Sequence, residues 1–190
     1  MDDLVGSARE YAQEAHEGQN RKGKDIPYFA HVEQVARTLS NYGFRDEVVA
    51  AGYLHDVTED VDEIGLSEIE RRFGEDVAEL VDGASEHNKS APWKVRKQHT
   101  IDYLRDGASP EEIALKASDK LDNVSSMREE RVYQGEEFWE KFNASYEDQV
   151  WYHREVVDAM GERIKHGSFV NGSLSDLYGE LKREVDQVFT

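Results

Sequence analysis

Residues 46–60 read DEVVAAGYLHDVTED, an apolar helical pattern that runs directly into acidic and imidazole side chains. The apolar part predicts a helix over 46–55, and small residues such as Gly52 predict close packing against a neighbouring helix. His55 and Asp56 stand at the end of that helix, where burial and the negative end of the helix dipole both disfavour a carboxylate. Because a bound cation would offset both costs, the stretch predicts a metal site at the end of a buried helix.

Two further acidic residues make the pattern specific. A lone His-Asp pair occurs readily by chance in a chain of this composition. Glu59 and Asp60, at the next fixed offsets, lower the chance expectation about a hundredfold. They follow about one turn after Asp56, and we expect them to orient or deprotonate an attacking water.

The charge balance excludes some classes of partner. Lys and Arg number 23 against 41 Asp and Glu, which gives a formal net charge of -18. Such a chain is repelled by nucleic-acid backbones and by anionic membrane surfaces, so we expect neither as a partner. If the substrate is a phosphorylated small molecule, positive charge must be concentrated locally, by a bound cation or by a few Lys and Arg side chains in the cleft.

The chain contains no cysteine, so a metal must be held by His, Asp and Glu side chains. The N-terminus lacks a basic start followed by an apolar run, and no apolar segment of about 18 residues occurs. We therefore expect a cytoplasmic protein.

Apolar residues recur at helical spacing in almost every segment, as at Ala8, Tyr11, Ala12 and Ala15. No window alternates in the manner of a strand, and only three prolines are present. The sequence predicts an all-α fold, a helical bundle of about eight to ten helices. We expect residues 1–190 to form a single domain, with 167–190 as a C-terminal helical extension.

Two other segments contribute residues that could face the same site. His31 should lie near the N-terminus of a helix over 32–41. Asp119 and Asn123 stand at i and i+4 of another helix and share one face, so both can point into one pocket. Taken singly, each has a plainer explanation, because such a histidine is commonly a cap or a surface residue and such a pair commonly faces solvent.

Together these positions form a ligand set for a divalent metal. His31, His55, Asp56 and Asp119 come from three helices and offer two imidazole nitrogens and two carboxylate oxygens. This set suits Mn, Fe, Zn, Co or Ni and does not suit Ca. A metal held there could lower the pKa of a water molecule and polarise a phosphoryl group.

Two basic segments stand out in so acidic a chain. The loop over 18–27 carries Arg21, Lys22 and Lys24, which are either a solvated loop or a phosphate-binding group. The segment over 87–97 is either an ordinary loop that enters a helix over 100–105 or a cover for an anionic ligand. The residues alone leave both pairs of alternatives open.

The motifs in their order resemble those of the HD phosphohydrolase superfamily, an all-helical fold that holds one or two metals. More narrowly, they resemble the hydrolase domain of bifunctional guanosine-tetraphosphate synthetase/hydrolases and the free-standing small alarmone hydrolases. The resemblance covers about residues 8–157. The motifs that carry it are Arg21-Lys22, Pro27-Tyr28, His31, His55-Asp56-x-x-Glu59-Asp60, Phe73-Gly74 and Asp119-Lys120-Leu121-x-Asn123.

The resemblance implies a metal-dependent hydrolysis in which water attacks the 3′-pyrophosphate and releases pyrophosphate with GDP or GTP. It implies one divalent metal, manganese, bound by the four ligands named above. It also implies that Glu59 and Asp60 serve the hydrolytic water, and that Arg21, Lys22 and Asn123 lie beside the nucleotide.

Three departures from the family pattern bear on the substrate more than on the metal. Val32 stands where Pro is common, Ser118 replaces a usual Ala, and Ser125 stands where bifunctional enzymes often carry Arg. Another nucleotide, either a nucleoside monophosphate or a phosphorylated dinucleotide, is therefore an alternative substrate. A non-catalytic nucleotide-binding sensor is a third hypothesis, which the presence of Glu59 and Asp60 disfavours.

Overall fold

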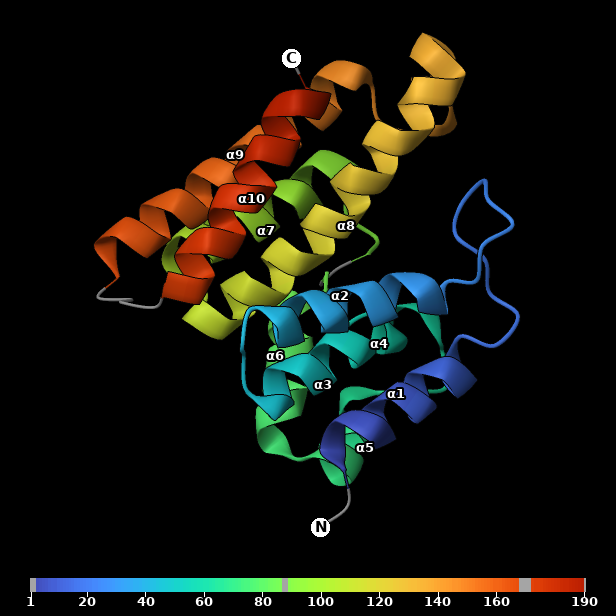
Figure 1. Cartoon of the computed structure of the whole chain (residues 1–190), viewed down its shortest axis with the longest axis vertical. Coiled ribbons are helices and arrows are strands. Elements are labelled where there is room, and N and C mark those ends of the chain that lie inside the picture. Colours follow the sequence, from blue (N-terminus) through green and yellow to red (C-terminus); the bar gives the residue numbers. More distant parts are fainter. Residues whose placement is uncertain (1–2, 87–88, 168–171, 190) are drawn as a thin grey trace. The chain divides into compact units, whose positions relative to one another are not determined.

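The computed structural model describes residues 3–86, 89–167 and 172–189. Within these ranges the chain forms helices and one isolated β-bridge, which confirms the all-α prediction (Figure 1). The helices are α1 (Leu4–Ala15), α2 (Phe29–Asn41), α3 (Asp46–Leu54), α4 (Val57–Asp60), α5 (Leu66–Phe73), α6 (Glu75–Ala84), α7 (Trp93–Asp106), α8 (Pro110–Gln134), the 3-10 helix η1 (Gly135–Lys141), α9 (Tyr146–His166) and α10 (Gly172–Val188).

The chain divides into two compact units. Unit 1 comprises Met1–Ser85 and Ala114–Asp119, and unit 2 comprises Glu86–Ile113 and Lys120–Thr190. Helix α8 supplies residues to both units. The single domain expected over 1–190, with 167–190 as an extension, stays a prediction.

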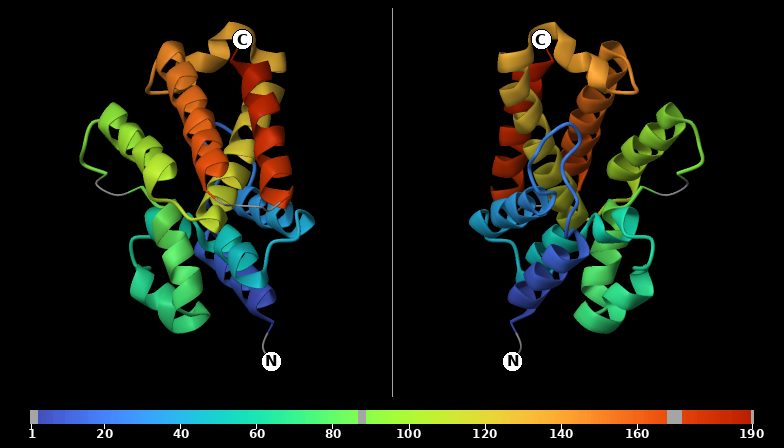
Figure 2. Two further views of the ribbon diagram at one scale, coloured as in Figure 1. Left: turned by 90° about the vertical axis from the view of Figure 1, so that its left-hand side faces the viewer. Right: turned by 90° about the vertical axis from the view of Figure 1, so that its right-hand side faces the viewer.

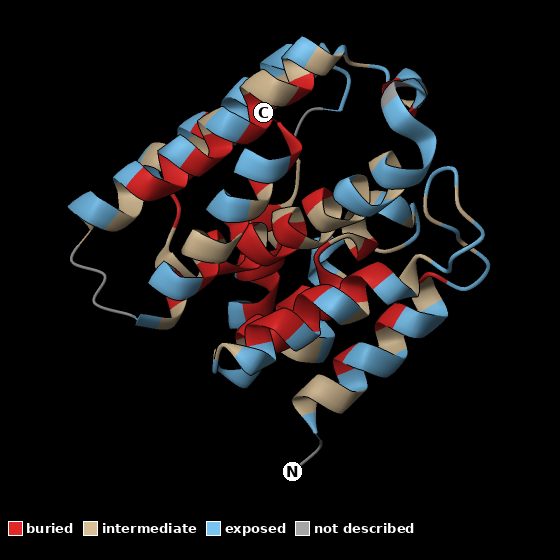
Figure 3. Cartoon of the chain, turned by 45° about the horizontal axis from the view of Figure 1, so that its top comes forward, coloured by how far each residue is buried: buried red, intermediate tan, exposed pale blue. Residues whose placement is uncertain are grey.

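Helix α3 forms the centre of unit 1. Every residue from Val48 to Leu54 is buried, as the red colouring of the helix shows (Figure 3). It packs against α1, α2 and α6. A Cβ atom on Gly52 would come within 2.8 Å of Leu39 Cδ1 and 3.0 Å of Ala36 Cα, so α2 and α3 are in backbone contact at this point. The close packing predicted at this glycine is therefore confirmed.

In unit 2, α9 packs against both α7 and α10 (Figure 2). Helix α8 opens with a capping box, in which Ser109 Oγ accepts from the Glu112 backbone N–H while the Glu112 carboxylate accepts from the Ser109 backbone N–H. These reciprocal bonds satisfy two backbone donors that a helix start would otherwise leave unpaired, and so they fix where α8 begins.

The basic segment over 87–97 differs from the predicted loop, because α7 already begins at Trp93. The Trp93 ring packs edge-on against Tyr152 of α9, at 5.9 Å between ring centroids, and this contact accounts for the early helix start. Arg96 and Lys97 both pair with Glu86. His87 and Asn88, which belong to the same predicted segment, lie outside the described residues.

None of the helices in the described part of the chain combines the length and the apolar composition that a membrane span requires.

Candidate metal centre

Four predicted ligands meet in unit 1. His31, His55 and Asp56 each place one ligand atom within 4.8 Å of the others. His55 Nε2 lies 3.1 Å and His31 Nε2 lies 3.6 Å from Asp56 Oδ2. Asp119 Oδ1 lies 3.5 Å from His31 Nε2. We call these four residues the ligand cluster.

Three helices deliver these side chains. His55 and Asp56 directly follow α3, which ends at Leu54, one residue before the predicted end. His31 lies in the first turn of α2, which begins at Phe29 and so three residues before the predicted start. That prediction was wrong because the turn after Pro27 is already helical, with the Ala30 N–H donating to Pro27 O at 3.1 Å. Tyr28, the residue before Phe29, also has helical backbone angles, with φ -59° and ψ -33°.

Asp119 reaches the ligand cluster from α8, and only 6% of its surface is exposed. Lys116, one turn earlier, places Nζ 3.7 Å from Asp119 Oδ2 and donates to the Ala84 carbonyl at 2.7 Å. This lysine partly neutralises the carboxylate. This role of Lys116 was not predicted from the sequence, because it depends on the packing of α8 beside the end of α6.

His55 has the tautomer that a metal ligand needs. Its Nδ1 lies 2.9 Å from Gly52 O, and because a carbonyl only accepts, Nδ1 carries the proton. In the neutral imidazole Nε2 then presents a lone pair, and this buried atom has no hydrogen-bond partner among the described residues. A buried lone pair beside two carboxylates fits a divalent cation, which would also offset the cost of burying those charges.

The electrostatics of the ligand cluster also favour a bound cation. Burial raises the pKa of the Asp56 carboxyl, but His55 and His31 outweigh burial and hold that pKa well below its usual range. Burial lowers the pKa of His55, but the Asp56 carboxylate outweighs burial and leaves that pKa raised. The same field that favours a proton on His55 favours a metal cation in its place.

Tyr28 is a neighbour of the cluster for which the sequence analysis predicts no role. Its hydroxyl donates to Asp56 Oδ2 at 2.6 Å. Burial and the nearby Asp56 carboxylate raise the pKa of Tyr28, so the phenol stays protonated and remains a donor. Two signals were available: its place in the Pro27-Tyr28 motif, and its position one helical turn before His31, which places both residues on one face.

Glu59 and Asp60 lie on α4, a single turn anchored to the cluster. The backbone N–H groups of both residues donate to Asp56 O, at 3.1 and 2.9 Å. Glu59 is half-buried and Asp60 is exposed. The backbone of both residues is thus held within one turn of a cluster residue, and the action of their carboxylates on a water molecule stays a prediction.

The predicted substrate contacts lie in two places. Arg21 and Lys22 belong to the loop between α1 and α2, which an antiparallel bridge between Asn20 and Pro27 closes. Asn123 lies four residues after Asp119 on α8, in unit 2. Their contact with a nucleotide stays a prediction.

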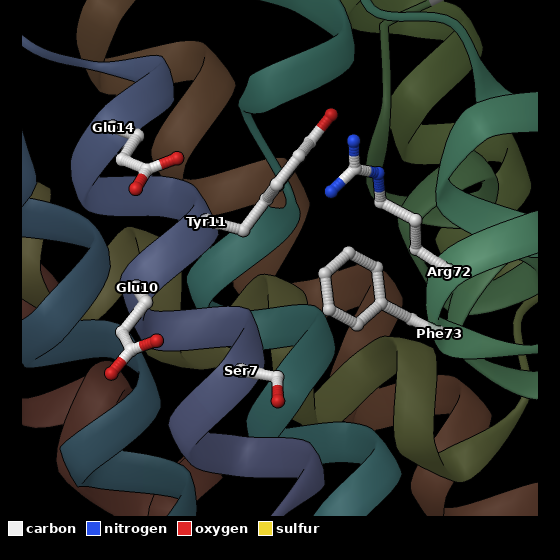
Figure 4. A pocket seen from close by; sticks show the side chains of 6 residues that line it. All are labelled: Ser7, Glu10, Tyr11, Glu14, Arg72 and Phe73. Carbon is white, nitrogen blue, oxygen red and sulfur yellow. The ribbon is translucent and has the colours of Figure 1, made fainter. Parts of the chain in front are cut away.

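A separate hollow of about 320 Å³ lies between α1 and α5 (Figure 4). Arg72 stacks over the Tyr11 ring there, with Cζ 4.8 Å from the ring centroid, and Phe73 meets the same ring edge-on. The hollow shares no residue with the ligand cluster. Its lining residues are Ser7, Glu10, Tyr11, Glu14, Arg72 and Phe73.

Comparison with known proteins gives a family match and curated relatives. The family model described as HD domain matches residues 8–143. The guanosine-3′,5′-bis(diphosphate) 3′-pyrophosphohydrolase of Aquifex aeolicus is 39% identical over 134 residues, which cover 67% of this chain and 18% of the relative. The Vibrio cholerae protein of the same name is 44% identical over 94 residues, 50% of this chain and 13% of the relative. The chain thus spans less than a fifth of either relative.

Two solved structures resemble the chain over most of its length. A protein from Listeria monocytogenes EGD-e is 39% identical, with a TM-score of 0.74, and the match covers 84% of this chain and 98% of that one. A metazoan ortholog of SpoT, described as hydrolysing ppGpp, is 25% identical, with a TM-score of 0.75, and the match covers 100% of this chain and 98% of that one. Matches of this length and quality support the same helical architecture for the chain.

Proposed function

We propose, because this chain belongs to the HD-domain family, that it is a metal-dependent phosphohydrolase that removes pyrophosphate from the 3′ position of guanosine-3′,5′-bis(diphosphate). The observation that carries the proposal is the ligand cluster, in which two imidazoles and two carboxylates from three helices converge. The names of the Aquifex and Vibrio relatives support the choice of substrate.

We propose that His31, His55, Asp56 and Asp119 hold one divalent metal, Mn²⁺. When bound, it would activate a water molecule and neutralise charge on the phosphoryl group. The protein contributes a fixed geometry, since the Gly52 carbonyl orients the His55 ring and places the proton of the neutral imidazole on Nδ1. A set of imidazole and carboxylate ligands suits Mn²⁺.

In this proposal Glu59 and Asp60 orient or deprotonate the attacking water, and the carboxylate that takes its proton passes that proton on to the departing ribose 3′ oxygen. The half-buried Glu59 is the better candidate for the base, because partial burial favours the neutral form that results when a carboxylate accepts a proton. One water is consumed, the bond between the ribose 3′ oxygen and its phosphorus breaks, and that oxygen leaves as a hydroxyl group. The products are GDP and pyrophosphate.

We propose that Arg21, Lys22 and Asn123 bind the nucleotide. The net charge of -18 repels phosphorylated ligands at long range, so cations on the closed loop after α1 are needed to bind them locally. The small nucleotide is the only partner that we propose. The absence of nucleic-acid and membrane partners and the cytoplasmic location stay predictions.

Product analysis tests this function. Protein stripped with EDTA should be inactive on guanosine-3′,5′-bis(diphosphate), and added Mn²⁺ should restore release of GDP and pyrophosphate in equal amounts, as resolved by ³¹P NMR. Another nucleotide would be the substrate if the protein released orthophosphate from nucleoside monophosphates or phosphorylated dinucleotides and released no pyrophosphate from guanosine-3′,5′-bis(diphosphate). Nucleotide binding without any product, over a panel of divalent metals, would show a sensor instead.

A further inference from the structure

The ligand Asp56 is held from outside the cluster by a tyrosine. Tyr28 donates to Asp56 Oδ2 at 2.6 Å, and this oxygen also lies 3.1 Å from His55 Nε2. A carboxylate can rotate about its Cβ–Cγ bond, so a short hydrogen bond to one oxygen selects one orientation of both. The tyrosine thereby determines which lone pairs Asp56 leaves available to a metal in the ligand cluster.

The Tyr28 ring is itself fixed on two sides. His31 meets it edge-on at 5.6 Å between ring centroids, and His16 lies against it at 4.9 Å. His16 is 2% exposed. A ring between two such neighbours cannot swing its hydroxyl away from Asp56 without disturbing buried packing.

Gln19 holds the His16 ring by a hydrogen bond and connects it to the end of α4. His16 Nδ1 lies 2.8 Å from Gln19 Oε1, and Gln19 O accepts from the Tyr28 backbone N–H at 2.9 Å. Gln19 Nε2 also donates to the Asp60 carbonyl at 3.4 Å. The same small network therefore contacts both Asp56 and the end of α4.

We infer that Tyr28 is a positioning residue for the metal ligand Asp56, and that His16 and Gln19 hold Tyr28 in the orientation that this role requires. The inference rests on the proposed metal site. Groups that hydrogen-bond to metal ligands typically change metal affinity or activity about 10- to 100-fold when they are removed. A purely structural hydroxyl would instead change stability and leave metal affinity as it was.

The test compares two tyrosines of unit 1. Tyr28→Phe removes the hydroxyl that reaches Asp56, and Tyr11→Phe removes a hydroxyl that donates to the Glu68 carboxylate at 3.3 Å, outside the ligand cluster. Mn²⁺ affinity is measured on stripped protein by competition with a chelating dye. We expect Tyr28→Phe to bind Mn²⁺ about 10- to 100-fold more weakly and Tyr11→Phe to match the wild type. At saturating Mn²⁺ we expect a lower kcat with little change in KM for Tyr28→Phe.

The shift of the unfolding midpoint on adding Mn²⁺, measured within each variant, gives a second readout that does not depend on baseline stability. It should be smaller in Tyr28→Phe than in the wild type or Tyr11→Phe. If Tyr28→Phe binds Mn²⁺ as the wild type does, while Asp56→Ala does not bind it, the inference is overturned and the proposed metal site stands. If Asp56→Ala also binds Mn²⁺ normally, the proposed metal site itself is wrong.

Discussion

Replacing Asp56 by alanine is expected to remove both the bound metal and the turnover. The change deletes the carboxylate that lies close to both imidazoles, at 3.1 Å from His55 Nε2 and 3.6 Å from His31 Nε2, and leaves Asp119 as the only acid among the three remaining ligands. Because every later step depends on the metal, we expect the rate to fall by more than about 10,000-fold, beyond the range of a lost general base. Metal content by atomic emission and pyrophosphate release by the same preparation provide the two readouts.

Glu59→Ala is the matched comparison for Asp56→Ala. Glu59 lies on α4 and is not a member of the ligand cluster, so its variant should keep a full complement of metal. We expect its rate to fall about 100- to 10,000-fold, as for loss of a general base. If Asp56→Ala retains its metal and its rate, the ligand cluster is not the catalytic metal site. If Glu59→Ala loses its metal, Glu59 supports the metal site as well as the water.

Gly52→Ala is expected to destabilise the protein and to weaken its metal site together. The added methyl would meet Leu39 Cδ1 at 2.8 Å and Ala36 Cα at 3.0 Å, so α2 and α3 must move apart. Overpacking of a buried contact costs about 1–3 kcal/mol, and part of this cost is offset by the better helix propensity of alanine. His31 stands on α2 and His55 follows α3, so separation of these helices also spreads the ligands.

A substitution at a second helical glycine serves as a control, because it separates the effect of tight packing from the effect of helix propensity. A Cβ on Gly179 of α10 would meet only Arg183 Nη1, at an ordinary 3.5 Å. Gly179→Ala should therefore gain the roughly 1 kcal/mol of helix propensity without a clash. Since both variants gain this propensity, we expect Gly52→Ala to be less stable than Gly179→Ala in urea unfolding by the overpacking cost of about 1–3 kcal/mol, and to bind Mn²⁺ more weakly. Equal stability of the two variants would contradict the tight contact between α2 and α3.

The four metal ligands were predictable because their residue types and their order along the chain can be recognised in the sequence. His55 and Asp56 interrupt an apolar helix, and a buried carboxylate at a helix end requires compensation wherever the rest of the chain lies. The bounds of α3 followed from the same pattern. His31 and Asp119 were predicted from the resemblance to a family and from their helical faces, and the structure brings both to the same cluster.

The surroundings of the ligands were not predictable in this way. Tyr28 and Asp56 are 28 residues apart, and their 2.6 Å contact depends on how α2 packs against α3. Lys116 reaches the Ala84 carbonyl only because α8 passes the end of α6. The early start of α7 at Trp93 likewise depends on an aromatic contact with α9. Each feature depends on tertiary packing, which outweighs the local sequence preference.

The most direct test of the account is a Mn²⁺ titration of stripped protein, followed by calorimetry, for the wild type and for Asp119→Ala. Asp119 comes from α8, far along the chain from the other ligands, so its effect tests whether the three helices share one site. We predict one Mn²⁺ per chain for the wild type and no comparable binding for Asp119→Ala. Unchanged affinity and stoichiometry in Asp119→Ala would contradict the account.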